Sequence, residues 1–207
     1  MKIISPSYEI LSPFIRNSMR IVELAGRTCY KSEDKITDDS AAPFVSKICN
    51  VFKHESVIEH SIITVKFVCD RGVSHELVRH RLCAFSQEST RYCNYSKEKF
   101  GREITVIKPL FFEQDSPKYN AWGNAMQAAE NAYFALIDLG ASPQEARSVL
   151  PNSLKTEIVV SANWREWRHI FRMRTSEKAH PQMREIMRPL YNELQGLLPE
   201  IFNQEPA

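Results

Sequence analysis

The greatest density of anion-binding side chains lies in the segment RHRLCAFSQESTRY, which begins at Arg79. Arg79, His80 and Arg81 are followed, after seven residues, by Ser89, and Arg91 lies two residues further on. Guanidinium groups bind phosphate and carboxylate oxygens in a bidentate manner, and serine hydroxyls add further donors. The segment therefore predicts an anion-binding site. The alternative is a solvated basic helix end followed by a polar loop.

A second basic cluster lies in the segment ANWREWRHIFRMR, at residues 162–174. On a helix, Arg165 and His169 are four residues apart and share a face. The large apolar residues of the segment can form the buried side: Trp164, Trp167, Ile170 and Phe171. Glu166 is the only acidic residue among several arginines, so an external anion is a reasonable partner. The alternative is an amphipathic helix with a solvated basic edge.

The histidines do not show the spacing of a metal site. His54 and His60 flank two carboxylates, but a zinc-binding helix needs histidines four residues apart on one face. A separation of six residues turns the two side chains about 120° away from each other. We therefore expect no metal. Cys83 and Cys93 lie near the basic loop, where arginines could lower a thiol pKa, so an enzyme nucleophile is a further possibility at this stage.

Length and composition are typical of one globular domain. The chain has 207 residues, 43% of them hydrophobic, and a net charge of +2, which argues against a general nucleic-acid surface. No apolar run reaches the roughly 18 residues that span a bilayer, and the amino terminus lacks the apolar core of a secretory signal. The five cysteines form no CxxC pair, which predicts reduced thiols and a cytoplasmic location. The glycines form neither GxGxxG nor a P-loop.

Hydrophobic periodicity and capping residues predict a mixture of strands and helices. We expect strands at Lys2–Ile4, Ser61–Cys69, Glu103–Lys108 and Leu154–Val160. We expect helices at Pro13–Tyr30, from Asp39 or Ser40 to Lys53, at Val73–Arg81, at Lys118–Leu139, from Ser142 to Pro151 with Arg147 on it, at Asn163–Arg174 and at Pro181–Leu197. RHR would then end a short helix, with an irregular segment up to Phe100. Because strands and helices do not alternate regularly, we predict an α+β fold. It would be a single catalytic domain over residues 1–207, with a mixed or antiparallel sheet flanked by helices.

The pattern RHR, seven residues and Ser is the signature of the flavin-dependent thymidylate synthases (ThyX), and residues 79–89 resemble it closely. Three other segments are similar to family segments: HESVIEH at His54–His60, EARSVLP at Glu145–Pro151 and ANWREWRHIFRMR at Ala162–Arg174. The resemblance implies a ThyX-like fold and the reductive methylation of dUMP to dTMP. It implies 5,10-methylenetetrahydrofolate as carbon donor and FAD as the relay of hydride from NADPH. It also implies a homotetramer with active sites at subunit interfaces, with neither nucleic acid nor a membrane as partner.

The resemblance further implies roles for single residues. Arg174 would be the catalytic residue, since its fixed charge would favour ionisation at N3 of the uracil ring. The positions matched to dUMP binding are Glu76, Arg79, Gln87, Glu88, Ser89, Arg91, Arg147 and Arg174. The positions matched to FAD binding are His54, Ser56, Arg79, His80, Arg81, Asn163, Arg165 and His169. The family uses no enzyme nucleophile, so neither Cys83 nor Cys93 is expected to attack the substrate.

Two positions depart from the family pattern. Many members have Gln where this chain has Glu76, and a carboxylate there would repel a nucleotide phosphate unless it is screened or turned away. An acidic residue is also common in the family shortly before the signature serine. Here Gln87 holds the aligned position, and Glu88 is the residue that could supply the carboxylate.

Two functions of other classes are alternatives. A single-strand nucleic-acid binder could use residues 79–95, with Phe85, Tyr92 and Tyr95 stacking on bases. The near-neutral net charge argues against this function. A flavoprotein of other specificity, such as a reductase without methyl transfer, would consume NADPH without forming dTMP.

Overall fold

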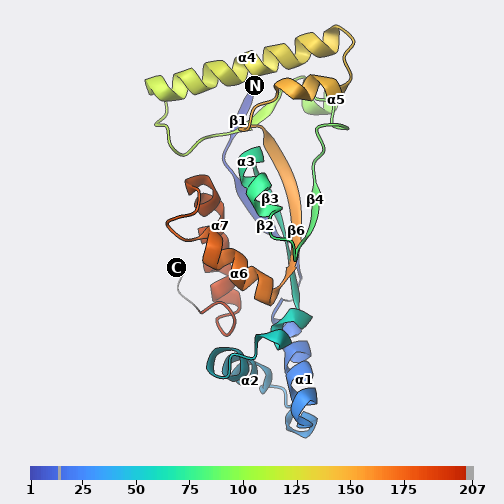
Figure 1. The fold of residues 1–207 in the computed structure, drawn as a ribbon, viewed down its shortest axis with the longest axis vertical. Helices are drawn as coiled ribbons and strands as arrows, with labels where there is room; N and C mark the ends of the chain where they lie inside the picture. Colours follow the sequence, from blue (N-terminus) through green and yellow to red (C-terminus); the bar gives the residue numbers. More distant parts are fainter. Residues whose placement is uncertain (14, 204–207) are drawn as a thin grey trace. The chain divides into compact units, whose positions relative to one another are not determined.

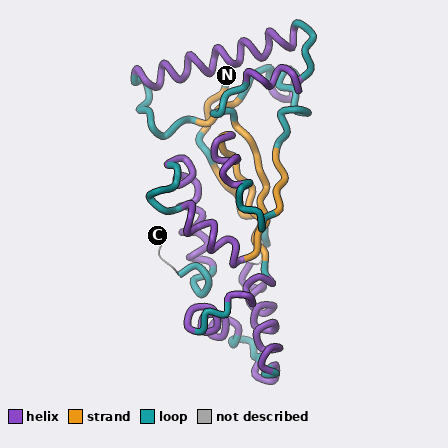
Figure 2. The backbone as a smooth tube through the Cα atoms, viewed as in Figure 1, coloured by secondary structure: helices purple, strands orange, loops and turns teal. Residues whose placement is uncertain are grey.

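The computed structural model describes residues 1–13 and 15–203. The chain forms two compact units. Unit 1 comprises residues 1–7, 67–79 and 86–158, and unit 2 comprises residues 8–66, 80–85 and the described residues from 159 onward. Figure 1 labels the elements along the chain, and Figure 2 separates helical, extended and loop segments.

Six strands and seven helices are described by the structure. The strands are β1 (Lys2–Ile4), β2 (Ser7–Ile10), β3 (Ile62–Asp70), β4 (Ala84–Gln87), β5 (Thr105–Ile107) and β6 (Lys155–Asn163). The helices are α1 (Met19–Tyr30), α2 (Ala41–Ser46), α3 (Arg71–Leu77), α4 (Pro117–Asp138), α5 (Pro143–Ala146), α6 (Trp164–Arg174) and α7 (Pro181–Leu197). Short 3-10 helices cover Ile15–Ser18, Glu33–Lys35, Glu55–His60, Glu98–Phe100 and Arg147–Val149, and a π-helical stretch covers Lys47–Val51.

The strands form two sheets. In unit 1, β1 and β5 pair in parallel, with Lys2 opposite Thr105 and Ile4 opposite Ile107. The other sheet has the strand order β2-β3-β6-β4. Side chains of β3 and β6 alternate between buried and more exposed positions, as the two-residue period of a strand requires when one face lies on a core. The predicted α+β fold, with a mixed or antiparallel sheet flanked by helices, is confirmed.

The core of unit 1 is built around α4. Ser116 caps this helix by accepting a hydrogen bond from the backbone N–H of Tyr119 at 3.2 Å. The helix contacts α5 (Figure 1), and its Tyr133 is fully buried against Tyr95, with the ring centroids 5.7 Å apart. The buried residues of this core cluster are Tyr95, Ile104, Val106, Met126, Tyr133, Ala146 and Leu154.

The core of unit 2 is built around α6 and α7. The predicted buried side of α6 is confirmed, since each of its four large apolar residues is at most 2% exposed. Phe171 stacks on Trp167 with ring centroids 5.5 Å apart and meets Tyr191 of α7 edge-on at 5.3 Å. Burying such aromatic rings supplies most of the stabilisation of a small core. It also holds the opposite, polar face of α6 in a fixed orientation.

Several predicted boundaries were wrong. The helix expected at Val73–Arg81 is α3, Arg71–Leu77. It begins earlier because the side chain of Asp70 caps it, accepting from the backbone N–H of Val73 at 2.7 Å. RHR therefore follows the helix rather than ending it. The segment expected to be irregular up to Phe100 contains β4, and β2 was not expected.

Two predicted helices are interrupted. The helix expected from Asp39 or Ser40 to Lys53 is α2 followed by a π-helical stretch. The capping box at Ser142 is present as predicted, but α5 ends at Ala146 and Arg147 opens a 3-10 turn. Across the described ranges, the structure contains no helix long and apolar enough to cross a membrane.

Candidate functional site

Helix α6 and the residue that caps its amino-terminal end carry three of the residues matched to flavin binding. Asn163 is the last residue of β6 and caps the helix, its Oδ1 accepting from the backbone N–H of Glu166 at 2.8 Å. Such a cap typically contributes about 1 kcal/mol and defines the first residue of the helix. The 3.6-residue period then puts Arg165 and His169 on one face, as predicted.

This face of α6 borders a cavity of about 600 Å³ in unit 2, a size typical of small-molecule sites. The lining residues are Glu55, Glu59, Leu82, Asn163, Arg165, Glu166, Arg168, His169 and Arg172. The structure therefore brings Asn163, Arg165 and His169 together at one cavity.

The arginines of α6 have acidic partners from another part of the chain. Arg165 Nη1 lies 2.5 Å from Glu59 Oε1, and Arg165 Nε lies 3.7 Å from Glu55 Oε2. Both carboxylates belong to the 3-10 helix Glu55–His60, about a hundred residues earlier in the chain. These glutamates are distant in sequence and near in space, so Arg165 has countercharge that its own segment does not supply.

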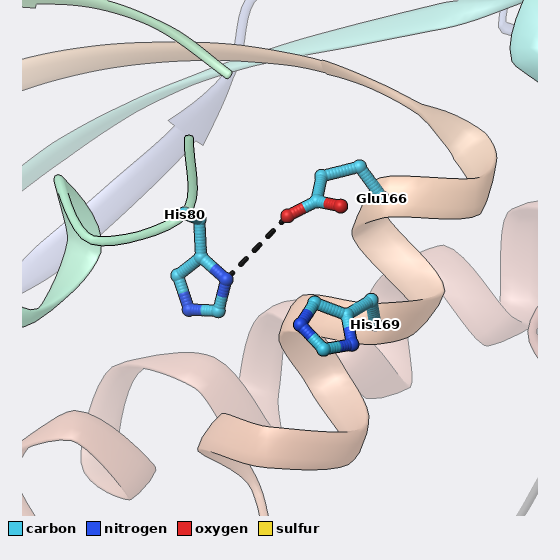
Figure 3. A group of neighbouring side chains, drawn as sticks. All are labelled: His80, Glu166 and His169. Carbon is cyan, nitrogen blue, oxygen red and sulfur yellow. Dashed lines mark ion pairs between the residues drawn. The ribbon is translucent and has the colours of Figure 1, made fainter. Parts of the chain in front are cut away.

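His80, of the RHR segment, and Arg174, at the end of α6, are in direct contact within unit 2. Arg174 Nε donates a hydrogen bond to His80 Nε2 over 2.9 Å. Because a guanidinium group has no acceptor, His80 Nε2 must carry the lone pair and Nδ1 must carry the proton. Nδ1 in turn faces Glu166, with Oε1 at 3.5 Å (Figure 3).

The imidazole of His80 is held neutral. It is 5% exposed, and burial, together with the nearby Arg174 and His169, lowers its pKa from 6.5 to about 4. Burial also raises the pKa of the Glu166 carboxyl group, an effect that His169 partly opposes. At neutral pH the contact between His80 and Glu166 is therefore not an ion pair but an interaction of a neutral N–H with a carboxyl oxygen.

His80, Glu166 and His169 also form a group of potential metal ligands, with one donor atom of each within 4.8 Å of the others (Figure 3). The sequence did not predict this grouping. Metal-binding histidines usually donate their second ring N–H to a carboxylate or carbonyl group. His80 instead accepts from the cationic Arg174, and His169 Nδ1 lies 3.2 Å from Nη2 of Arg172. These contacts with arginine differ from the carboxylate or carbonyl contacts that usually support a metal site.

The remaining flavin-matched residues of unit 2 lie at its surface. His54 is exposed, and its Nδ1 lies 3.0 Å from the hydroxyl of Tyr30. Ser56 and Arg81 are also exposed. Among the residues that the structure describes, these three do not line the cavity beside α6. The residues matched to flavin binding therefore do not all meet at this cavity.

The other predicted residues belong to unit 1. Among them, Glu88 is largely buried and has two side-chain partners. Its Oε2 lies 2.9 Å from Nζ of Lys155, and its Oε1 accepts from the hydroxyl of Tyr95 at 3.3 Å. The Glu88 side chain is 13% exposed. Burial alone would lower the pKa of Lys155, but hydrogen bonds to Glu157 and Glu88 raise it overall. Glu88 is thus engaged by a charged partner that local sequence could not indicate.

Gln87 is also engaged within unit 1. Its Nε2 donates to Oγ of Ser74 at 2.9 Å and to Oγ1 of Thr156 at 3.2 Å, which ties β4 to α3 and β6. The next turn is closed by Ser89, whose carbonyl oxygen accepts from the backbone N–H of Cys93 at 2.9 Å.

The basic candidates of unit 1 lie near the surface. Arg79, Arg91 and Arg147 are exposed, and Glu76 is half-buried. Arg91 Nε donates to Oε1 of Gln144 at 3.1 Å, so Arg91 contacts helix α5. Arg147 directly follows the last residue of the same helix.

Two alternatives from the sequence lose support. Burial, together with the nearby Glu166 carboxyl group, raises the pKa of the Cys83 thiol to about 12, so Cys83 is a protonated thiol at neutral pH and a poor nucleophile. Among the aromatic residues offered for base stacking, Tyr92 is exposed but Tyr95 is only 5% exposed inside the core of unit 1. Tyr95 is therefore not available to stack on a base.

Three residues of interest, Arg168, Glu166 and Lys155, were not among the predicted site residues. Arg168 could have been found, because it lies three residues after Arg165 and so on the same face of α6. Glu166 carried a weaker signal as the one acidic residue in a basic helix. Lys155 carried none, since its partner Glu88 is 67 residues away.

The sequence and the fold both match known proteins. A sequence model of the family described as "Thymidylate synthase complementing protein" matches residues 11–200. The flavin-dependent thymidylate synthase of Geobacter sulfurreducens is 35% identical over 188 residues, which cover 87% of this chain and 79% of that protein. The enzyme of the same name from Pyrococcus furiosus is 30% identical over 175 residues, covering 84% of this chain and 70% of that protein.

Solved structures show the same fold. The UMP/dUMP methylase PolB from Streptomyces cacaoi, bound to 5-Br dUMP, has a TM-score of 0.78 and 21% identity, covering 98% of this chain and 96% of that chain. Thymidylate synthase X from Helicobacter pylori, with FAD and dUMP, has a TM-score of 0.72 and 23% identity, covering 96% and 100% of the two chains. With the family match over residues 11–200 and two relatives at or above 30% identity, the chain belongs to the flavin-dependent thymidylate synthase family.

Proposed function

We propose that this chain converts dUMP to dTMP, with 5,10-methylenetetrahydrofolate as carbon donor and NADPH as the source of reducing equivalents. Membership of the family supports the methylation of dUMP by a flavin-dependent enzyme. FAD supplies hydride transfer when bound, and the protein contributes binding, orientation and electrostatics.

One observation carries the proposal: the contact between His80 and Arg174. Two segments matched to the family from separate parts of the chain, 94 residues apart, meet through a 2.9 Å hydrogen bond. One of these residues is matched to flavin binding and the other to uracil activation. The flavin and the nucleotide must lie close together in the active site to react. Direct contact between a residue matched to flavin binding and one matched to uracil activation meets this requirement.

The chemistry of the cavity beside α6 fits an anionic flavin dinucleotide. Its lining combines the guanidinium groups of three arginines with the imidazole of His169 and the Asn163 side chain. Guanidinium and imidazole N–H groups are donors suited to the oxygen acceptors of a phosphate-containing ligand. We propose that the flavin is held by His54, Ser56, Arg79, His80, Arg81, Asn163, Arg165 and His169.

Arg174 is the proposed catalytic residue. A fixed cation facing N3 of uracil would favour its ionisation and raise the electron density at the carbon that is methylated. The hydrogen bond to His80 fixes the Nε side of its guanidinium plane. Because His80 stays neutral, it accepts from Arg174 without adding a second positive charge.

For dUMP, we propose contacts from Arg79, Ser89, Arg91 and Arg147, with Glu76, Gln87 and Glu88 beside them. Gln87 and Glu88 are engaged by Ser74, Thr156, Lys155 and Tyr95 in unit 1, so they are suited to position the turn at Ser89. We further propose that the two units act as one catalytic domain, in a cytoplasmic homotetramer with active sites at subunit interfaces.

The experiment that tests this function is a visible absorption titration of the purified chain. FAD is restored to the protein, the spectrum is recorded, and dUMP is added. We expect a bound-flavin spectrum that shifts with dUMP, followed by dTMP formation once methylenetetrahydrofolate and NADPH are supplied.

Other outcomes separate the alternatives. NADPH consumption without dTMP, with a flavin spectrum indifferent to dUMP, would identify a flavoprotein of other specificity. A protein that binds no flavin but binds oligonucleotides in a strongly salt-dependent manner would be a single-strand nucleic-acid binder.

A further inference from the structure

His54 lies on a backbone segment that the protein holds in an uncommon conformation. The segment begins with the π-helical stretch Lys47–Val51, and such turns are frequent at functional sites. Lys53, directly before His54, has a φ of 59°, in the left-handed region that residues with a side chain rarely adopt. The backbone N–H of His54 donates to the carbonyl oxygen of Ile48 at 3.0 Å, which helps to fix this arrangement. The fold therefore places His54 against the local preference of the chain.

The side chain of His54 has a partner on a neighbouring helix of unit 2. Helix α1 packs on both α2 and the 3-10 helix Glu55–His60, which follows His54 directly. At the end of α1, the hydroxyl of Tyr30 lies 3.0 Å from Nδ1 of His54. The ring of Phe52 lies beside the imidazole, with ring centroids 6.0 Å apart. Nδ1 is therefore occupied, whereas Nε2 makes no hydrogen bond to another residue that the structure describes.

Tyr30 contributes little to the core of unit 2. Its position continues the helical spacing of Gly26 and Arg27, which are buried, but Tyr30 itself is 58% exposed. An exposed ring gains little from the hydrophobic effect. The contact between Tyr30 and His54 is therefore not a by-product of core packing.

The chemistry of the two groups sets the direction of their hydrogen bond. A phenol hydroxyl donates readily, and a neutral imidazole has one nitrogen that accepts and one that carries a proton. When Tyr30 donates to Nδ1 of His54, the proton of the imidazole lies on Nε2. Nδ1 and Nε2 lie on different edges of the ring, so a partner that holds Nδ1 also fixes the direction in which the Nε2–H group points.

We propose that Tyr30 is a positioning residue, which holds Nδ1 of His54 so that the Nε2–H group donates to an acceptor on the flavin ring. The proposal rests on the proposed function, in which His54 binds the flavin, and adds a residue to which the sequence resemblance assigns no role. A side chain that binds a ligand is held more accurately when a second hydrogen bond fixes its orientation. Tyr30 thus acts through His54 and does not itself contact the flavin.

The test is a double-mutant cycle in the full-length chain. Tyr30→Phe removes the hydroxyl and keeps the ring, His54→Ala removes the imidazole, and a third protein carries both substitutions. Tyr119→Phe is the control, because it removes the same hydroxyl group from a residue of unit 1. The dissociation constant for FAD is measured for each protein from the flavin spectrum, and the ligand-free melting temperature shows whether each variant is folded. Nitrogen NMR of the FAD-free protein at about pH 8, above the titration range of histidine, reports which nitrogen of His54 carries the proton.

We expect Tyr30→Phe to weaken FAD binding roughly fivefold, the effect of one hydrogen bond, with an unchanged melting temperature. In the His54→Ala background the same substitution should change FAD affinity less than about twofold, because the hydroxyl then has no imidazole to hold. A merely structural role of Tyr30 would give the same loss in both backgrounds. The wild-type NMR spectrum should show the proton of His54 on Nε2, and Tyr119→Phe should match wild type in FAD affinity.

Unchanged FAD affinity in Tyr30→Phe would overturn the proposal, and so would an equal loss with and without the His54 imidazole. A proton on Nδ1 of His54 in wild type would overturn it as well, because Tyr30 would then be the acceptor. If wild type binds FAD and forms dTMP while the cycle is negative, the proposed function stands without this residue. If wild type binds no FAD, the proposed function itself fails and this inference fails with it.

Discussion

Arg174 donates its Nε hydrogen to the unprotonated Nε2 of His80 over 2.9 Å. This single contact decides the tautomer of the imidazole, because a guanidinium group can only donate. It also aligns one edge of the guanidinium plane of Arg174 within unit 2.

Arg174→Ala should separate flavin binding from turnover. The variant loses the fixed cation that we place against uracil but keeps Asn163, Arg165 and His169 at the cavity. We expect FAD affinity within about threefold of wild type and kcat/KM for dTMP formation lower by at least tenfold, which corresponds to about 1.4 kcal/mol. Near-normal turnover would remove Arg174 from its role. Arg20→Ala, an exposed change in the same unit, serves as the control.

The buried neutral state of His80 predicts how stability depends on pH. In the unfolded chain His80 is protonated below about pH 6.5, but in the folded protein only below about 4. The unfolded state therefore binds more protons between these values, so the free energy of unfolding falls as pH drops from 6.5 to 4. A pKa shift of this size corresponds to on the order of 3 kcal/mol.

Urea unfolding of wild type and His80→Gln at pH 7 and pH 4.5 measures this contribution. Wild type should lose more unfolding free energy than His80→Gln over this interval, because glutamine does not titrate. Parallel losses in the two proteins would show that His80 is not the titrating group. Imidazole nitrogen shifts in the NMR spectrum at pH 7 should also show the proton on Nδ1.

Lys155→Met should destabilise unit 1 through the partner that it leaves behind. The side chains of Lys155 and Glu88 are 19% and 13% exposed, so removing the ammonium group leaves a buried carboxylate with Tyr95 as its remaining described hydrogen-bond partner. We expect a loss of about 3 kcal/mol in unfolding free energy at pH 7. The double variant Lys155→Met/Glu88→Gln should recover part of it, since the buried carboxylate at position 88 is then removed as well. A double variant as unstable as the sum of the singles would contradict this account.

Cys83 should be inert. Its thiol is protonated at pH 8 because burial raises its pKa to about 12. Iodoacetamide at this pH should label the exposed Cys29 well before Cys83, as peptide mass mapping of the native protein would show. Turnover of Cys83→Ser should stay within about threefold of wild type. A variant without activity but with an unchanged melting temperature would revive the enzyme nucleophile.

The sequence determined the features that depend on neighbouring residues. The caps at Asn163 and Ser142 lie where their side-chain types predict, because a cap is made within one turn of chain. The buried face of α6 follows from the spacing of its aromatic residues, since the helical period is a local property. The motif spacing also indicated the family, which the comparisons confirm over residues 11–200.

The tertiary structure alone decided the partners of the charged groups. Glu59 neutralises Arg165, Lys155 holds Glu88, and Arg174 sets the tautomer of His80, over sequence separations of 106, 67 and 94 residues. Such pairs have no local signature, because a charge looks the same in sequence whether its partner is water or a distant side chain. The short strands β2 and β4 escaped prediction for a related reason: four residues carry too little periodicity, and pairing with a neighbouring strand decides their conformation.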